Sequence, residues 1–132
     1  MTKSARHKRR TPIQGAFYLK HRADCPVVTQ ADGLTLRYLL PQNSVEKSTT
    51  TIGLQEVELQ PGTQTDGHSA AGEQIVWQIL QGAGLMNLGE TQFAVVPGDI
   101  ILIPADQPYR LTNKSEVALR LNQITTPIPN PS

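Results

Sequence analysis

The sequence predicts an all-β domain of the sandwich or barrel type. Short β-prone segments recur along the chain between residues that favour turns, and no stretch shows the spacing of an amphipathic helix. The 132 residues include 10 glycines and 10 prolines without a period, which suits a small β protein with many turns. This length is typical of one domain, and no internal repeat divides it.

The predicted strands are apolar or β-branched segments that end where turn residues begin. In chain order they are Leu34–Leu40, Thr50–Leu59, His68–Ala70, Gln74–Gln81, Leu85–Leu88, Thr91–Val96, Asp99–Ile103, Tyr109–Thr112 and Val117–Ile124. The pairs Pro61 with Gly62 and Pro97 with Gly98 are typical of the turns between them, because proline fixes φ and glycine readily adopts positive φ.

Side chains along a strand alternate between its two faces. Glu56 and Glu58 therefore share one face of their segment, and Val57 and Leu59 share the other. We expect the glutamate face to be solvated and the apolar face to be buried.

Three regions are predicted: a basic flexible arm (1–14), a β-barrel domain (15–125) and a proline-rich tail (126–132). Seven of the 12 basic residues, and no acidic residue, lie in the first 22 positions, so the rest carries five basic and 11 acidic residues. Gly15–Lys20 is a short β-prone segment that we expect at a sheet edge or a subunit boundary. Proline cannot donate to a ladder, so the tail is expected to end the last strand.

Composition argues against several classes of partner. The basic block Lys3–Arg10 has no interleaved aromatic residues, so we do not expect nucleic-acid binding. No apolar stretch approaches the roughly 20 residues of a membrane span, and the basic N-terminus lacks the apolar core of a signal peptide. The one cysteine, Cys25, excludes an internal disulfide framework. We therefore expect a cytoplasmic protein.

Two spaced motifs resemble those of the cupin family, which are written G-x5-H-x-H-x(3,4)-E-x6-G and G-x5-P-x-G-x2-H-x3-N. In the first motif, Gly62, His68 and Gly82 keep both the residue types and the spacing, and in the second Gly98, Pro104 and Asn113 do. The match covers roughly residues 33–122. The resemblance implies a double-stranded β-helix, that is, a jelly-roll barrel with an internal pocket, and a homodimer.

The resemblance also implies a metal held by two histidines and a glutamate of the first motif and a histidine of the second. The corresponding positions here are His68, Ala70, Ile75 and Tyr109. Ala70 and Ile75 have no donor atoms, and a neutral phenol is a poor ligand for a divalent ion. We therefore expect no cofactor at the standard metal site.

A displaced set of ligands is the alternative for a metal. Asp66, His68 and Glu73 reproduce the ligand spacing of the family one two-residue step toward the barrel mouth. We prefer the undisplaced frame because it keeps the glycine spacings. The displaced set stays open as a divalent-metal site or as a metal-free acid and base group, and Asp66 and Glu73 equally suit ordinary loop carboxylates.

The pocket is expected to be chiefly apolar, lined by Ala70, Ile75, Trp77 and Ile79. Two polar residues would act in it: His68 as a general base or acid and Tyr109 as a hydrogen-bond donor to a developing oxyanion. Asp66 or Glu73 would orient or assist His68. Each residue also has a structural interpretation, as a core side chain or a solvated one.

We therefore expect a small-molecule-binding protein. The preferred hypothesis is a metal-independent isomerase, cyclase or lyase that transfers protons on a carbonyl-containing substrate. One alternative is a noncatalytic ligand-binding or accessory module, and another is a metal-dependent enzyme that uses the displaced Asp, His and Glu set.

Overall fold

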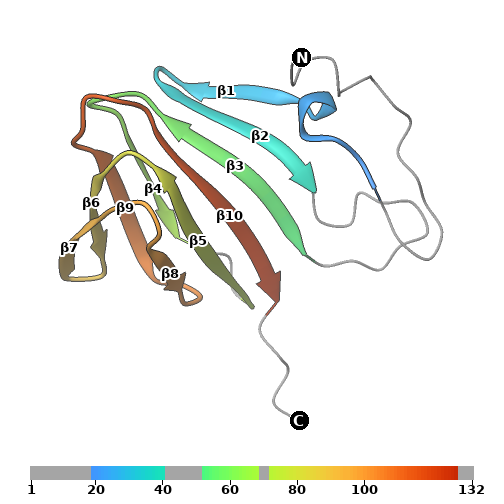
Figure 1. Cartoon of the computed structure of the whole chain (residues 1–132). Coiled ribbons are helices and arrows are strands. Elements are labelled where there is room, and N and C mark those ends of the chain that lie inside the picture. Colours follow the sequence, from blue (N-terminus) through green and yellow to red (C-terminus); the bar gives the residue numbers. More distant parts are fainter. Residues whose placement is uncertain (1–18, 41–51, 69–71, 128–132) are drawn as a thin grey trace, which may run out of the picture.

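The computed structural model describes residues 19–40, 52–68 and 72–127 (Figure 1). The described chain is built of strands, with one short 3-10 helix, η2 (Arg22–Asp24), before the first of them. The strands are β1 (Val27–Ala31), β2 (Leu34–Leu40), β3 (Gly53–Leu59), β4 (Gln64–His68), β5 (Glu73–Gln81), β6 (Gly84–Leu88), β7 (Thr91–Val95), β8 (Ile100–Ile103), β9 (Pro108–Asn113) and β10 (Leu119–Pro127).

The strands form two antiparallel sheets that face each other (Figure 1). One sheet has six strands in the order β1-β2-β3-β10-β5-β8, and the other has four in the order β4-β9-β6-β7. The chain therefore crosses repeatedly between sheets, and strands distant in sequence, such as β3 and β10, lie side by side. The fold is the jelly-roll barrel that the sequence predicts.

The alternation of side chains along the strands builds the core. The inner face of the six-stranded sheet contributes Val57, Trp77 and Leu121, and the smaller sheet contributes Met86 and Leu111. All five are at most 3% exposed. Since the two apolar faces meet, neither sheet could be stable in water without the other.

The predicted strands agree with the observed ones with two exceptions. β2 coincides with its predicted segment, and β3 and β5 to β10 overlap theirs. The strand predicted at His68–Ala70 overlaps β4 only at His68, since the other two residues lie outside the described ranges; the described part of β4 is the polar stretch Gln64–His68, which pairs with β9. β1 was missed because its residues are all exposed, so they show no alternation of apolar and polar side chains.

The ends of the described chain differ slightly from the predicted regions. β10 continues to Pro127, which lies opposite Glu73, so the strand takes in the first two residues of the predicted tail. The predicted arm (1–14) and most of the predicted edge segment Gly15–Lys20 lie outside the described residues.

Asn113 closes one end of the barrel. Its side chain is 1% exposed, and its Nδ2 donates to the carbonyls of Leu59 and Val117, both at 2.9 Å. Its Oδ1 accepts from the backbone N and the hydroxyl of Ser115, both at 2.8 Å. One buried amide therefore ties the end of β9 to β3 and shapes the turn before β10, with its hydrogen-bonding capacity satisfied.

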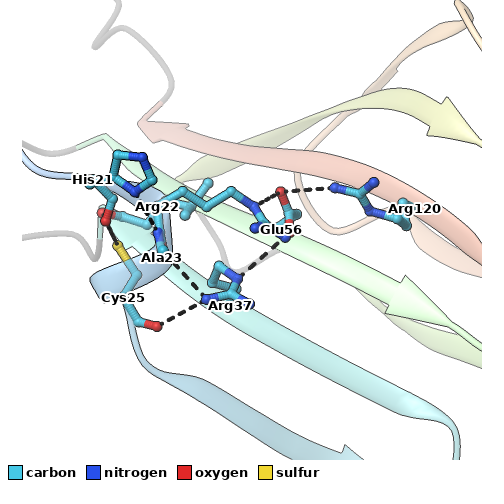
Figure 2. A network of polar contacts seen from close by, with 8 residues as sticks. His21, Arg22, Ala23, Cys25, Arg37, Glu56 and Arg120 are labelled. Atoms are coloured by element: carbon cyan, nitrogen blue, oxygen red, sulfur yellow. Dashed lines mark hydrogen bonds and ion pairs between the residues drawn. The ribbon is translucent and has the colours of Figure 1, made fainter. Parts of the chain in front are cut away.

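The outer face of the six-stranded sheet carries an ion-pair network centred on Glu56 (Figure 2). Arg22 of η2 donates through Nε to Glu56 Oε2 at 2.8 Å and also through Nη2 to Oε1. Arg120 Nη2 lies 3.4 Å from Oε2, and Arg37 Nε lies 3.8 Å from Oε1. The glutamate face that we expected to be solvated is therefore partly covered, and the Glu56 side chain is 11% exposed.

The network fixes the segment before β1 onto the sheet. Arg37 Nη1 also donates to the carbonyls of Arg22 and Cys25, both at 3.3 Å. The hydrogen bond from Arg22 holds the pKa of Glu56 below its ordinary value, although burial opposes this. The fold therefore favours the charged form of Glu56.

Replacing Glu56 with Gln should destabilise the protein in a pH-dependent way. A lowered pKa in the folded state contributes stability above the ordinary glutamate pKa, and this contribution is lost as the pH falls through the folded pKa. We expect Glu56→Gln to reduce the free energy of unfolding by about 1 kcal/mol at neutral pH, because Arg22 is half exposed. Urea unfolding of both proteins across the acidic range measures the difference, which should disappear in acid.

Glu58→Gln is the matched control, since Glu58 lies on the same face of β3 but makes none of these ion pairs within the described part of the chain. An equal loss in this variant, or a loss for Glu56→Gln that does not change with pH, would contradict the role given to Glu56.

Candidate functional site

A cavity of about 300 Å³ opens between the two sheets, toward the opposite end of β3 from the turn that Asn113 closes. It is lined by Gln30, Leu36, Tyr38, Gln55, Val57, Thr65, Asp66, Trp77, Tyr109 and Gln123. This volume is at the small end of the range of about 300–1,000 Å³ for ligand pockets. The cavity is more polar than the sequence predicts, because amides and phenols share its walls with Leu36, Val57 and Trp77.

A hydrogen-bonded row of side chains crosses the floor of the cavity. Trp77, Gln123 and Gln55 occupy paired positions on β5, β10 and β3. Trp77 Nε1 donates to Gln123 Oε1 at 2.9 Å, and Gln123 Nε2 donates to Gln55 Oε1 at 3.2 Å. Because an indole can only donate, it fixes the orientation of the first amide, and the first amide fixes that of the second.

Tyr109 forms the facing wall. Its ring meets that of Trp77 edge-on, with centroids 5.0 Å apart and planes at 78°, a favourable geometry for aromatic pairs. Its position depends on Gly67, the residue opposite it on β4. A Cβ at position 67 would lie 3.2 Å from the Tyr109 hydroxyl, so a larger residue would push the phenol aside.

The Tyr109 phenol remains protonated at neutral pH. Burial raises its pKa above the ordinary value, and the negative charge of Asp66 raises it further. The hydroxyl is therefore available as a donor at the cavity wall.

Asp66 lies at the rim of the cavity, in β4 opposite Arg110. Asp66 Oδ2 is 3.5 Å from Arg110 Nε, and both side chains are more than half exposed, at 54% and 53%. In this geometry the ion pair is weak. The carboxylate is close enough to the phenol to affect its pKa, but it stays solvated.

The comparisons with known proteins agree with this architecture. Residues 55–125, more than half of the chain, match the family model for the cupin domain.

The chain belongs to the cupin family. It is 32% identical over 96 residues to the uncharacterized protein MJ1618 of Methanocaldococcus jannaschii, an alignment that covers 73% of this chain and 74% of the relative.

Solved cupin structures show the same fold. The cupin domain of Cnp3 from Schizosaccharomyces pombe superposes with a TM-score of 0.69 at 16% identity, over 92% of this chain and 90% of that one. A sugar phosphate isomerase of the cupin superfamily from Silicibacter pomeroyi superposes with a TM-score of 0.60 at 22% identity, over 74% of this chain and 62% of that one.

The structure places the predicted site residues of this cupin in different surroundings. Trp77, Tyr109 and Asp66 lie around the cavity, whereas Ile75 and Ile79 are buried in the core at 5% and 1% exposure and do not line it. Glu73 begins β5 and is partly buried, but it is not part of the cavity wall either.

Two of the predicted site residues, His68 and Ala70, lie partly or wholly outside the described residues. The backbone of His68 ends β4 opposite Pro108, but its side chain lies outside what the structure describes, as does Ala70. The role of His68 as an acid or base stays a prediction.

The standard cupin ligand positions do not fit a metal ion in this chain. Ile75 is buried among apolar residues, Ala70 has no donor, and Tyr109 presents a neutral phenol. Within residues 19–40, 52–68 and 72–127, no three His, Cys, Asp or Glu residues gather as an ion would require. The displaced set of Asp66, His68 and Glu73 stays a prediction.

The amides of the cavity, Gln55, Gln123 and Gln30, were not among the residues predicted from the sequence. The signal for two of them was present in the alternation of the strands. Gln55 is two residues before Val57, and Gln123 is two residues after Leu121, so both share a face with a buried residue.

In the described part of the chain, no helix is long and apolar enough to cross a membrane.

A titration of the tyrosines should detect the raised pKa of Tyr109. We expect the ultraviolet absorbance change of tyrosinate that Tyr109→Phe removes to occur above pH ~10, the ordinary tyrosine pKa. Because the raised pKa favours the neutral form in the fold, its contribution to stability is complete below the ordinary pKa and is lost as the pH rises through the folded one. Asp66→Asn should lower this pKa without restoring the ordinary value. A transition at or below the ordinary pKa would contradict the burial of the phenol.

Proposed function

We propose that the cavity of this cupin binds a small carbonyl compound and catalyses a proton transfer on it without a metal, as an isomerase, cyclase or lyase does. The cupin fold and its cavity support small-molecule binding. The observation that carries the catalytic proposal is the protonated Tyr109 phenol in the wall of a cavity that can admit a carbonyl group.

In the proposed step, a base removes the proton from the carbon next to the carbonyl. The electron pair of that C–H bond forms a C=C bond, and the carbonyl oxygen becomes an enolate oxygen. Tyr109 donates a hydrogen bond to this oxygen and stabilises its charge. Return of the proton to the neighbouring carbon gives an isomer, whereas loss of a leaving group gives an elimination product.

His68 is the proposed base, with Asp66 or Glu73 assisting it. Asp66 supports this assignment through its position at the cavity rim, beside Tyr109. The similarity in fold to a sugar phosphate isomerase is consistent with isomerase chemistry for this chain.

The alternative is a noncatalytic ligand-binding or accessory module. One observation favours it: Asp66 is solvated and paired with Arg110, so it is neither desolvated nor free to act as a strong base. A metal-dependent enzyme that uses Asp66, His68 and Glu73 is a further alternative, and elemental analysis of the purified protein tests it.

Deuterium exchange tests the catalytic proposal. The protein is incubated in deuterium oxide with dihydroxyacetone, D-fructose or D-fructose 6-phosphate, and mass spectrometry follows deuterium uptake at the carbon beside the carbonyl. We expect Tyr109→Phe to slow the exchange by roughly 10²–10³-fold, the usual effect of losing one oxyanion donor. His68→Ala should abolish it.

Tyr38→Phe is the matched control because Tyr38 is the other phenol that lines the cavity. Equal rates in wild type and Tyr109→Phe would refute the role of Tyr109. Binding of a probe with no exchange would refute catalysis and favour the noncatalytic module.

We also propose that the protein forms a homodimer through β8, one edge of the six-stranded sheet. Ile100 and Leu102 point outward from this strand and are 70% and 55% exposed. An apolar edge strand can pair with a strand of another chain, and a second copy supplies an identical edge.

In sedimentation analysis, Leu102→Lys should yield monomers. Val117→Lys, at an equally exposed position away from β8, should not. A monomeric wild type would contradict the proposal.

The cytoplasm stays the proposed compartment of the protein.

A further inference from the structure

The cavity holds an unusual balance of hydrogen-bonding groups. The ten described residues that line it include three glutamines, two tyrosines and a threonine, and none of these ten is a lysine, an arginine or a histidine. The one charged side chain among them is the carboxylate of Asp66. A ligand that enters this cavity therefore meets neutral polar groups and a single negative charge.

The direction of the hydrogen-bonded row decides which atoms the amides offer. Trp77 Nε1 donates to Gln123 Oε1, and Gln123 Nε2 donates to Gln55 Oε1. Gln55 Nε2 is left at the end of the row, and the hydrogen bonds among the described residues do not use it as a donor. No buried side-chain nitrogen or oxygen of the described chain lacks a partner, so this NH₂ group reaches the cavity space.

The free N–H groups of the row are therefore hydrogen-bond donors, and each Oε1 keeps one lone pair. Gln55 Nε2 carries two N–H groups, and Gln123 Nε2 has one beyond the hydrogen bond to Gln55. The Tyr109 hydroxyl adds a third donor group from the opposite sheet. These groups suit a ligand with several acceptor oxygens, such as carbonyl and hydroxyl groups.

The charges of the residues that line the cavity indicate which charge a ligand can carry. A phosphate or carboxylate group in the cavity would lie near Asp66, and the ten described wall residues include no cation to offset its desolvation. Arg110 lines a neighbouring hollow, to which Asp66 and Tyr109 also contribute, and its Nε lies 3.5 Å from Asp66 Oδ2.

We infer that this cavity selects an uncharged, oxygen-rich small molecule, of the class of free sugars and related polyhydroxy carbonyl compounds, and that Gln55 determines this specificity through its NH₂ group. The inference rests on the proposed function, because it names the substrate class of the same site. The inference concerns the affinity of the cavity for its ligand, and this affinity is measured without any reaction taking place.

Trp77 provides the measurement. It is the single tryptophan of the chain, and it lies in the cavity wall, so its fluorescence reports occupancy of this site. The purified full-length protein is titrated with D-fructose and with D-fructose 6-phosphate, which differ in the phosphate group. We expect D-fructose to change the fluorescence in a saturable way and to bind at least tenfold more tightly than its phosphate.

Gln55→Glu tests the donor. A carboxylate keeps the oxygen that accepts from Gln123 Nε2 but removes both N–H groups, so the row stays intact while the donors are lost. We expect D-fructose binding to weaken by roughly tenfold, about the effect of one lost hydrogen bond. Gln55→Leu, which carries no charge, should weaken it similarly.

Gln78→Glu is the matched control. Gln78 lies on β5 of the same sheet, two strands away from β3, with its side chain exposed on the outer face, and its Oε1 accepts from Asn122 Nδ2 at 3.4 Å. The same substitution there adds the same charge outside the cavity. We expect wild-type affinity in this variant.

Each outcome decides the inference. Tighter binding of the phosphate, unchanged affinity in both Gln55 variants, or no saturable response to D-fructose would overturn it. Deuterium exchange with the phosphorylated sugar alone would leave the proposed function standing while this inference fails. Selective binding of D-fructose without exchange would leave the inference standing while the catalytic proposal fails.

Discussion

The hydrogen bonds from Trp77 to Gln123 and from Gln123 to Gln55 are the interaction on which the site depends. A polar side chain inside a small barrel is costly unless it has partners. The indole N–H, which can only donate, supplies the first partner and so sets the orientation of both amides. The same row holds the Trp77 ring against Tyr109. The hydrogen bonds that link β5, β10 and β3 therefore involve the same Trp77 side chain that packs against Tyr109. They also set the direction in which the amide donors point.

The two ends of β3 have different roles: one end contacts Asn113, and the other end lines the cavity. At Leu59, the buried side chain of Asn113 binds the backbone and closes the barrel. Four residues earlier, Gln55 takes part in the open end, where the cavity lies. Between them, Glu56 points to the outer face and binds Arg22, which holds the chain before β1 in place. One strand thus supports the core, the cavity and the outer network through the alternation of its side chains.

The sequence predicted the fold well, because the turn residues and the glycine and proline spacings of the two motifs are local features. It also predicted that Trp77 lies in the interior. It failed where pairing between strands decides the outcome. β4 has a polar sequence and is a strand because β9 offers it a partner. The amides of the cavity were missed because glutamine is normally a surface residue, and only the register of β3 with β10 brings Gln55 and Gln123 together.

The central claim is that the ligand binds at the donor groups of Gln55 and Gln123. Nuclear magnetic resonance of ¹⁵N-labelled protein titrated with D-fructose tests it most directly, because side-chain amides and the single indole N–H give separate signals. The account predicts that the largest shifts occur at the side-chain NH₂ groups of Gln55 and Gln123 and at the Trp77 indole. Shifts concentrated instead around the hollow formed by Cys25, Leu39 and Leu54 on the other face of the sheet, or no shifts, would contradict it.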